Sequence, residues 1–152
     1  MAPVVQRLAV DCSVVVKWKL AGEPQAAESE QLFLDWQHPV IEVCSPNLLE
    51  IEVMSAFLRA CRQGRLRDTE AMDFIRDLLA LPFMLHRMTT AMALRAFEIA
   101  QRYNQRSYDC VYVALAEQEA VEFWTGDQRL YNALHAPYPF VRWIADYRQK
   151  RP

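Results

Sequence analysis

Glycine is scarce in this sequence. Only three of the 152 residues are glycine, which argues against a glycine-rich phosphate-binding loop and against an all-β fold with many tight turns. No apolar run approaches the roughly 20 residues that a membrane-spanning helix needs. Residues 1–7 lack the long apolar core of a secretory leader. We therefore expect a protein without a membrane segment that stays in the cytoplasm.

Closely spaced cysteine and histidine ligands are also missing. The four cysteines, at positions 12, 44, 61 and 110, include no C-x-x-C pair, and the three histidines do not cluster with them. A structural zinc site needs such close pairs, so the sequence argues against one. Each cysteine lies among apolar residues and is expected to pack as a small buried side chain.

Positive charge is not in excess. The formal net charge is −2 at pH 7, which gives no general attraction to nucleic acid. Any binding of nucleic acid must therefore come from local basic patches and from metal ions.

The composition is that of a globular protein. With 53% hydrophobic and 24% charged residues, a chain of this length can bury a substantial core, and we expect one domain over residues 1–152. Predicted strands alternate with predicted helices, which indicates an α/β fold with a mostly parallel sheet. The expected strands are 8–11, 40–44, 84–88, 121–124 and 140–144. The expected helices are a short one capped near Ser13, then 25–36, 47–63, 68–81, 90–103, 108–120 and 128–135.

Typical capping residues mark the ends of these helices. Pro46 opens the long helix 47–63, and Gly64 follows it in the position that glycine favours after a helix. Asp68 is the expected N-cap of the next helix, and Thr89 or Thr90 that of the helix reaching Tyr103.

Four acidic residues stand out, although each has a purely structural explanation. Asp11 and Asp127 each follow a strand and precede a helix, so either could be an N-cap. Asp109 lies in the first turn of a helix, where a carboxylate is stabilised by the helix dipole. Glu52 lies within a helix and could be an ordinary solvated residue.

Their combination favours a metal site. Asp11 and Asp127 lie at the carboxyl ends of strands, where open α/β sheets bind ligands, and the helix start at Asp109 is expected at the same edge. Glu52 shares a helix face with Ser55, Arg59 and Arg62. Oxygen ligands without histidine or cysteine select Mg²⁺ or Mn²⁺ over zinc. Without a cation, the converging carboxylates would repel one another and raise some of their pKa values.

The helical spacing leaves a second glutamate open as the fourth ligand. Glu50 lies on a different arc of the same helix, together with Met54, Phe57 and Cys61. Periodicity alone does not choose between Glu50 and Glu52.

Four segments, 9–18, 46–56, 107–117 and 124–130, resemble PIN domains, and more narrowly the VapC toxins of toxin–antitoxin pairs. The block Tyr-Asp-x-x-Tyr-x-Ala-Leu-Ala-Glu at 108–117 and Thr-x-Asp at 125–127 are the more specific motifs. The resemblance implies a three-layer α/β/α sandwich with a mostly parallel sheet. It selects Glu52 over Glu50, and the implied acidic quartet is Asp11, Glu52, Asp109 and Asp127.

The supporting polar residues of the family fall on Ser13 and Thr125. Ser55 stands where many relatives have asparagine, and a serine can still donate a hydrogen bond to Glu52. The family's activity is that of an endoribonuclease that needs Mg²⁺ or Mn²⁺ and is inhibited by a cognate antitoxin. We assign Asp11, Glu52 and Asp109 mainly to metal binding, and Asp127 to a second metal or to orienting the attacking water.

Contacts with RNA are expected from basic residues around the motifs. Lys17, Arg59, Arg62 and Arg129 are the candidates, and contacts of this kind with phosphates do not depend on base sequence. A homodimer is also expected, because the apolar arc Met54, Phe57, Leu58 and Cys61 is wider than one helix face needs, and because VapC toxins suggest it.

Two other functions use the same fold. A housekeeping PIN nuclease for RNA maturation has the same site chemistry and no antitoxin. A catalytically inactive PIN fold would serve as a binding module, although the presence of all four acids argues against it.

Overall fold

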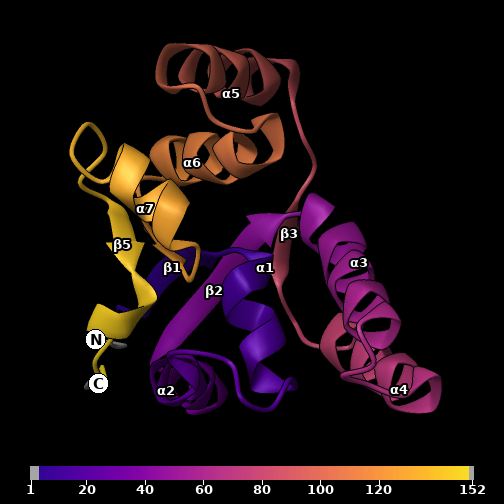
Figure 1. The fold of residues 1–152 in the computed structure, drawn as a ribbon. Coiled ribbons are helices and arrows are strands. Elements are labelled where there is room, and N and C mark those ends of the chain that lie inside the picture. The colour runs from indigo at the N-terminus through magenta and orange to yellow at the C-terminus, as the bar shows by residue number, and fades with distance from the viewer. Residues whose placement is uncertain (1–3, 151–152) are drawn as a thin grey trace.

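The computed structural model describes residues 4–150, and a sheet of five strands lies at the centre of this range. The strand order is β3-β2-β1-β4-β5, and each neighbouring pair is parallel (Figure 1). The strands are β1 (Gln6–Val10), β2 (Ile41–Pro46), β3 (Met84–His86), β4 (Glu122–Thr125) and β5 (Val141–Trp143).

Strand β1 occupies the middle of the sheet, where Ala9 is paired with Cys44 of β2 on one side and with Phe123 of β4 on the other. The chain proceeds outward from β1 to β2 and β3, and then returns to build β4 and β5 on the opposite side. The order of the strands therefore reverses between β1 and β4. Parallel sheets bind ligands beyond the carboxyl ends of the strands at such a point.

Helices connect the strands and cover both faces of the sheet. The α-helices are α1 (Cys12–Val15), α2 (Ala26–Gln37), α3 (Leu48–Arg62), α4 (Asp68–Leu79), α5 (Thr90–Tyr103), α6 (Ser107–Glu119) and α7 (Gln128–Leu134). Two 3₁₀-helices, η1 (Val16–Trp18) and η2 (Ile144–Asp146), complete the elements of the described residues.

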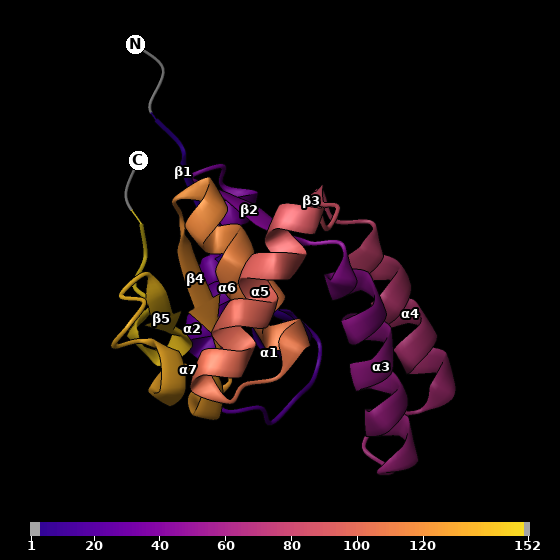
Figure 2. The same cartoon turned by 90° about the horizontal axis from the view of Figure 1, so that it is seen from above.

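Successive residues of a strand point to opposite faces, and here they enter two separate cores. On β1, Leu8 and Val10 belong to the core shared with α1, α2, α3 and α4, whereas Ala9 belongs to the core shared with α5, α6 and α7. The two groups of helices lie on opposite sides of the sheet (Figures 1 and 2). This confirms the predicted three-layer α/β/α sandwich with a parallel sheet.

Helix α6 is buried on nearly every side. All residues from Cys110 to Ala116 are buried, because the sheet covers one side of the helix and α5 covers another (Figure 1). A helix that is buried in this way is apolar all round, as the sequence 110–116 is. The packing fixes the position of Asp109, which lies in the first turn of α6.

Helices α3 and α4 pack side by side, and Gly64 follows α3 with a positive φ of 71° (Figure 2). Phe57 of α3 is fully buried against Phe74 of α4, with 5.8 Å between the ring centroids. The apolar arc on α3 was predicted to be wider than the core needs, but α4 covers part of it. Met54 and Leu58 remain about half exposed, at 50% and 47%.

Most helix ends agree with the predictions, with three corrections. Pro46 ends β2 and does not open the long helix, because Asn47 is the N-cap of α3. Thr89 is the N-cap of α5, and its hydroxyl accepts a hydrogen bond from the Met92 N–H at 3.1 Å. Asp68 is the first residue of α4 and not its cap, since Arg67 occupies the cap position. Helix α1 begins at Cys12, one residue before the predicted cap at Ser13.

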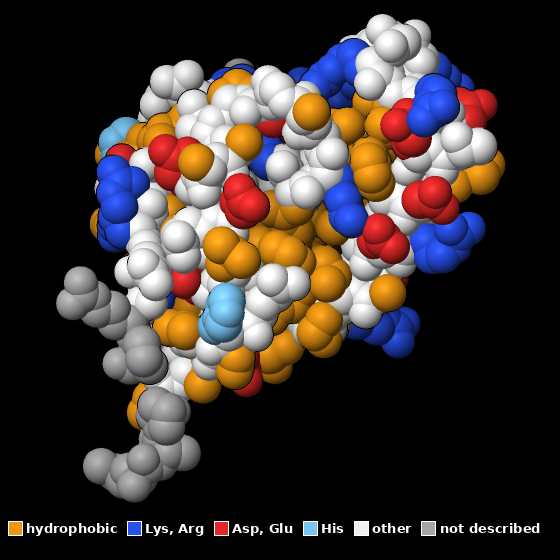
Figure 3. All heavy atoms as spheres, turned by 90° about the horizontal axis from the view of Figure 1, so that it is seen from below, with side chains coloured by type: hydrophobic (Ala, Val, Ile, Leu, Met, Phe, Trp, Pro, Cys, Tyr) orange, Lys and Arg blue, Asp and Glu red, His pale blue; other side chains and the backbone are white. Residues whose placement is uncertain are grey.

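Aromatic side chains gather where η1 and α2 meet the segment before β3. Trp18 and Trp36 lie 6.1 Å apart between ring centroids, and both contact Phe83. Figure 3 shows hydrophobic side chains gathered on the lower face of the molecule, where α2 and α4 lie. Among the described residues, no helix has the length and apolar character needed to cross a lipid bilayer.

Candidate active site

The four acidic residues selected from the sequence line a single cavity of about 280 Å³. They come from four separate segments, which end or begin at the carboxyl edge of the sheet between β1 and β4. The other polar residues of the lining are two serines and two arginines. The polar lining thus consists of Asp11, Glu52, Asp109, Asp127, Ser13, Ser55, Arg59 and Arg106.

Asp11, directly after β1, is the most buried of the four acids, with 7% of its surface exposed. The Thr125 hydroxyl donates a hydrogen bond of 2.6 Å to Oδ2, and the Ser13 hydroxyl donates one to Oδ1. Burial raises the pKa of Asp11 to about 7, although these two hydroxyls lower it and Glu52 and Asp109 raise it further. Asp11 stands in the N-cap position of α1, yet its carboxylate makes no capping bond.

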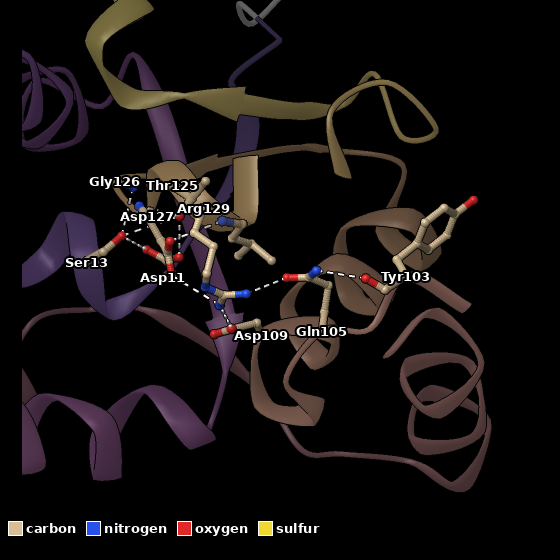
Figure 4. Close-up of polar contacts among 10 residues, drawn as sticks. Asp11, Ser13, Tyr103, Gln105, Asp109, Thr125, Gly126, Asp127 and Arg129 are labelled. Atoms are coloured by element: carbon tan, nitrogen blue, oxygen red, sulfur yellow. Dashed lines mark hydrogen bonds and ion pairs between the residues drawn. The ribbon is translucent and has the colours of Figure 1, made fainter. Parts of the chain in front are cut away.

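The same hydroxyls join the end of β1 to the loop after β4 (Figure 4). Ser13 Oγ accepts a hydrogen bond of 2.7 Å from the Gly126 N–H, and Thr125 Oγ1 accepts one of 3.0 Å from the Asp127 N–H. The backbone at Gly126 passes so close that a Cβ there would lie 2.8 Å from Cε of Lys17. Ser13 and Thr125 thus lie beside Asp11 as the resemblance implied, whereas Gly126 was not predicted.

Asp127 is the N-cap of α7. Its Oδ1 accepts a hydrogen bond of 3.1 Å from the Leu130 N–H, while Oδ2 lies 3.6 Å from the Arg129 guanidinium. The structural explanation that the sequence offered for both strand-end aspartates therefore applies to Asp127 and not to Asp11. An N-cap uses one carboxylate oxygen, and the other lies next to Arg129.

Arg129 supplies positive charge inside the acidic cluster (Figure 4). Its guanidinium lies 2.9 Å from Oδ2 of Asp109 and also contacts Asp127, so that it bridges the two acids. It donates a further hydrogen bond of 2.6 Å to Gln105, whose amide donates one to the Tyr103 carbonyl. The sequence suggested RNA phosphate as the partner of Arg129; the structure places it on carboxylates of its own chain, and an RNA contact stays a prediction.

This ion pair also affects the acidity of Asp109. Burial raises the pKa of Asp109 and the nearby Asp127 raises it further, while Arg129 and Arg106 lower it. The repulsion expected among the acids in the absence of a cation is therefore partly compensated by arginine.

Glu52 of α3 receives its hydrogen bond from an unpredicted residue. The Tyr112 hydroxyl donates to Oε1 at 2.8 Å, and burial raises the pKa of Glu52 in spite of this bond. Tyr112 lies three residues after Asp109 in α6, a spacing that places both on one side of the helix. This spacing was visible in the sequence as the signal for Tyr112. Ser55, the expected donor, lies on the cavity wall.

Glu50, which the helical spacing left open, lies elsewhere. It lines a separate, mostly apolar groove together with Ile51, Met88 and Tyr108. The structure therefore places Glu52, and not Glu50, with the three aspartates.

Cysteines follow two of the acids directly in the sequence. Cys12 lines the acidic cavity, and Cys110 is buried in α6. Burial raises the pKa of both thiols, that of Cys110 to about 11, and neighbouring carboxylates raise them further. All four cysteines are free thiols.

The donor set of the cavity suits a hard divalent cation, because it consists of carboxylate and hydroxyl oxygens. As the side chains lie, however, no group of three or more Asp, Glu, His or Cys residues within 4–150 is arranged to hold a metal ion. Each acid is instead bound to a group of the protein itself. A cation bound to these oxygens of Asp109 and Asp127 would compete with Arg129 for them.

The predicted basic residues divide into three groups. Arg59 borders the acidic cavity and a larger neighbouring one, and Lys17 lines the neighbouring cavity. Arg129 lies within the acidic cluster. Arg62 is exposed in the last turn of α3 and does not line either of these two cavities.

The acids converge where the strand order of the open parallel sheet reverses, between β1 and β4. This arrangement defines a class of α/β proteins with a polar site at the strand ends. A family model described as the PIN domain matches residues 8–134. Because this match spans most of the chain, the protein belongs to the PIN domain family. Among curated proteins, none matches this chain.

Solved structures of similar fold include proteins of archaea and bacteria. PAE2754 from Pyrobaculum aerophilum is 16% identical, with a TM-score of 0.63 over 92% of this chain and 91% of its own. VapC20 of Mycobacterium tuberculosis, described as a toxin that cleaves the sarcin–ricin loop, is 17% identical, with a TM-score of 0.63 over 84% and 95%. A toxin–antitoxin complex from Klebsiella pneumoniae contains a chain that is 16% identical, with a TM-score of 0.59 over 90% and 97%. At these identities the likeness concerns the fold.

The raised pKa of Asp11 predicts a pH-dependent stability for the metal-free protein. The folded chain keeps the Asp11 proton up to about pH 7, whereas the unfolded chain releases it near the ordinary value of 3.8. Between these values the unfolded state binds fewer protons, so the free energy of unfolding falls as pH rises. Asp11→Asn should remove this fall, which amounts to roughly 4 kcal/mol by pH 8.

The measurement is urea unfolding of both proteins from pH 4 to pH 8 in EDTA. Asp146→Asn, which changes an exposed carboxylate, is the matched control and should keep the wild-type dependence on pH. Identical pH profiles for wild type and Asp11→Asn would contradict the assignment.

Proposed function

We propose that this protein is a metal-dependent endoribonuclease that hydrolyses RNA phosphodiester bonds at the acidic cavity. The observation that carries the proposal is the meeting of Asp11, Glu52, Asp109 and Asp127 in one cavity at the switch point of the sheet. Membership of the PIN domain family supports it. Mg²⁺ or Mn²⁺ is the cation that these oxygen donors favour.

Each side chain has a part in the hydrolysis. Asp11, Glu52 and Asp109 would hold the cation, and the Asp127 oxygen that does not cap α7 would hold a second ion or orient the attacking water. When bound, the cation lowers the pKa of a coordinated water and stabilises the charge that develops on the phosphate. Arg59 and Arg106 line the same cavity and neutralise phosphate oxygens. Water attacks phosphorus, and the bond from phosphorus to the leaving ribose oxygen breaks.

We further propose that the chain is the toxin of a toxin–antitoxin pair, with a cognate antitoxin protein as partner and RNA in the cytoplasm as substrate. Similarity of fold to VapC20 and to the chain from the Klebsiella pneumoniae toxin–antitoxin complex supports this. A homodimer remains part of the proposal, and the half-exposed Met54 and Leu58 of α3 are available for such a contact. A housekeeping nuclease for RNA maturation is the alternative with the same chemistry.

Cleavage of RNA should require Mg²⁺ or Mn²⁺ and should depend on Glu52 but not on Glu50. Glu52→Gln keeps the shape of the side chain and removes an anionic ligand, so cleavage should fall at least a hundredfold. Glu50→Gln is the matched control, because Glu50 lines a different groove on the same helix. The assay is cleavage of total RNA and of a labelled single-stranded RNA, with Mg²⁺ or with EDTA. Undiminished cleavage in EDTA would contradict the metal requirement.

Expression of the wild-type chain alone should arrest bacterial growth, and expression of Asp11→Asn should not. The reason is that the toxin activity depends on the acidic cavity, from which the variant removes a charge. Growth curves are compared at equal protein levels, verified by immunoblot. Normal growth at high levels of active wild-type enzyme would favour the housekeeping function.

Removal of the Arg129 charge should strengthen metal binding. Because the guanidinium occupies Asp109 and Asp127, a cation must displace it, and Arg129→Met abolishes this competition. We expect the dissociation constant for Mn²⁺, measured by calorimetry at pH 8, to fall about tenfold. Arg106→Met is the control, since Arg106 acts on Asp109 through its charge without forming an ion pair, and it should change the dissociation constant by less. Weaker Mn²⁺ binding by Arg129→Met would show that Arg129 supports the ion and does not compete with it.

A further inference from the structure

A second cavity lies directly beside the acidic one. Its volume is about 420 Å³, which is within the range of small-ligand pockets. Ser13, Val16, Ala56 and Arg59 line both cavities, so the two are contiguous along α1 and α3. The proposed hydrolysis uses the acidic cavity and leaves this larger neighbour without a role.

The charge of the second cavity is opposite to that of the first. Three cations, Lys17, Arg59 and Arg65, line it together with one carboxylate, Glu23. The Arg65 guanidinium lies 2.7 Å from Glu23, so that this carboxylate is already paired. Lys17 and Arg59 remain as charges without a carboxylate partner within the described residues, and the cavity therefore favours an anion.

Lys17 is the more constrained of these two cations. Its side chain is partly buried, and its Cε lies close to the backbone of Gly126. Burial lowers the pKa of the ammonium, while Glu23 and Asp11 raise it. Lys19, two residues on, forms an ion pair of 2.9 Å with Asp77, whereas Lys17 pairs with no residue in the described part of the chain. A partly desolvated ammonium of this kind is a binding group for phosphate.

Other residues of the lining suit a base. Trp143 is partly buried at the end of β5, and its ring centroid lies 5.8 Å from that of Tyr131. Gln63 and Gln128 offer amide groups at the same cavity. Gln25, also in the lining, has a positive φ of 53°, a conformation that is uncommon for residues other than glycine and is enriched at ligand sites.

From these features we infer that the second cavity binds a nucleotide of single-stranded RNA next to the one being cut, with its phosphate on Lys17 and its base against Trp143. The inference rests on the proposed ribonuclease function and adds a binding subsite to it. Aromatic stacking accepts any base, so Lys17 and Trp143 provide affinity, and the glutamines provide contacts to base edges.

The test compares variants of the full chain in binding a fluorescent single-stranded RNA of eight nucleotides. Binding is measured by anisotropy in EDTA over a series of salt concentrations. Lys17→Met should weaken binding about tenfold and reduce the slope of log K against log salt by about 1, because one phosphate contact is lost. Lys19→Met is the matched control and should bind within twofold of wild type. Trp143→Leu should weaken binding about tenfold without changing the salt slope.

Cleavage of the same RNA with Mg²⁺ is measured in parallel and separates the two proposals. Lys17→Met should raise KM and leave kcat nearly unchanged, since it removes binding and not chemistry. Lys17→Arg keeps the charge and should restore most of the affinity, which distinguishes a lost phosphate contact from a folding defect. If the wild type cleaves RNA but Lys17→Met matches Lys19→Met in affinity and KM, the subsite is wrong and the ribonuclease stands. If the wild type neither binds nor cleaves RNA, both proposals fail.

Discussion

Four carboxylates converge at one edge of the sheet, and their repulsion has to be compensated by groups of the chain itself. Burial makes this repulsion costly, because a desolvated carboxylate favours its protonated form. Asp11 is balanced by two hydroxyl donors, Glu52 by the Tyr112 hydroxyl, and the pair Asp109 and Asp127 by Arg129. The acids of the site are thus paired with separate donors of the chain. A bound cation can take the place of these hydroxyl and guanidinium donors.

The compensation also holds distant segments together. Thr125 donates to Asp11 across 114 residues of sequence, and Ser13 accepts from Gly126 across 113. These bonds fasten the loop after β4 to the end of β1, at the point where the strand order reverses. Substitution of Asp11 therefore changes the junction between the two halves of the sheet as well as the site. The local stability of this junction and the chemistry of the cavity thus depend on the same oxygen atoms, those of the Asp11 carboxylate and of the Ser13 and Thr125 hydroxyls.

The sequence was sufficient for an α/β fold with a parallel sheet and for the position of most elements, because apolar runs such as those of β1 and α6 are local patterns. The three layers came from the resemblance to PIN domains. It placed three aspartates at one sheet edge, since strand ends in a parallel sheet share an edge. It did not choose between Glu50 and Glu52 by spacing, because the choice depends on which face of α3 meets α6. The partner of Arg129 was missed for the same reason: the side chain reaches Asp109 across 20 residues, and no pattern along one helix contains that contact.

The two cysteines that directly follow Asp11 and Asp109 bear on selectivity between metals. A soft ion such as Zn²⁺ or Cu⁺ gains affinity from a thiolate ligand. Here burial and the neighbouring carboxylates both oppose loss of the thiol proton, so the thiolate is disfavoured. The negative charge of the carboxylates that attracts a hard cation to their oxygens thus also keeps the two cysteine thiols protonated. Since the thiolate is the reactive form of cysteine, the same protonation slows the reaction of the Cys12 thiol with peroxide and with alkylating reagents.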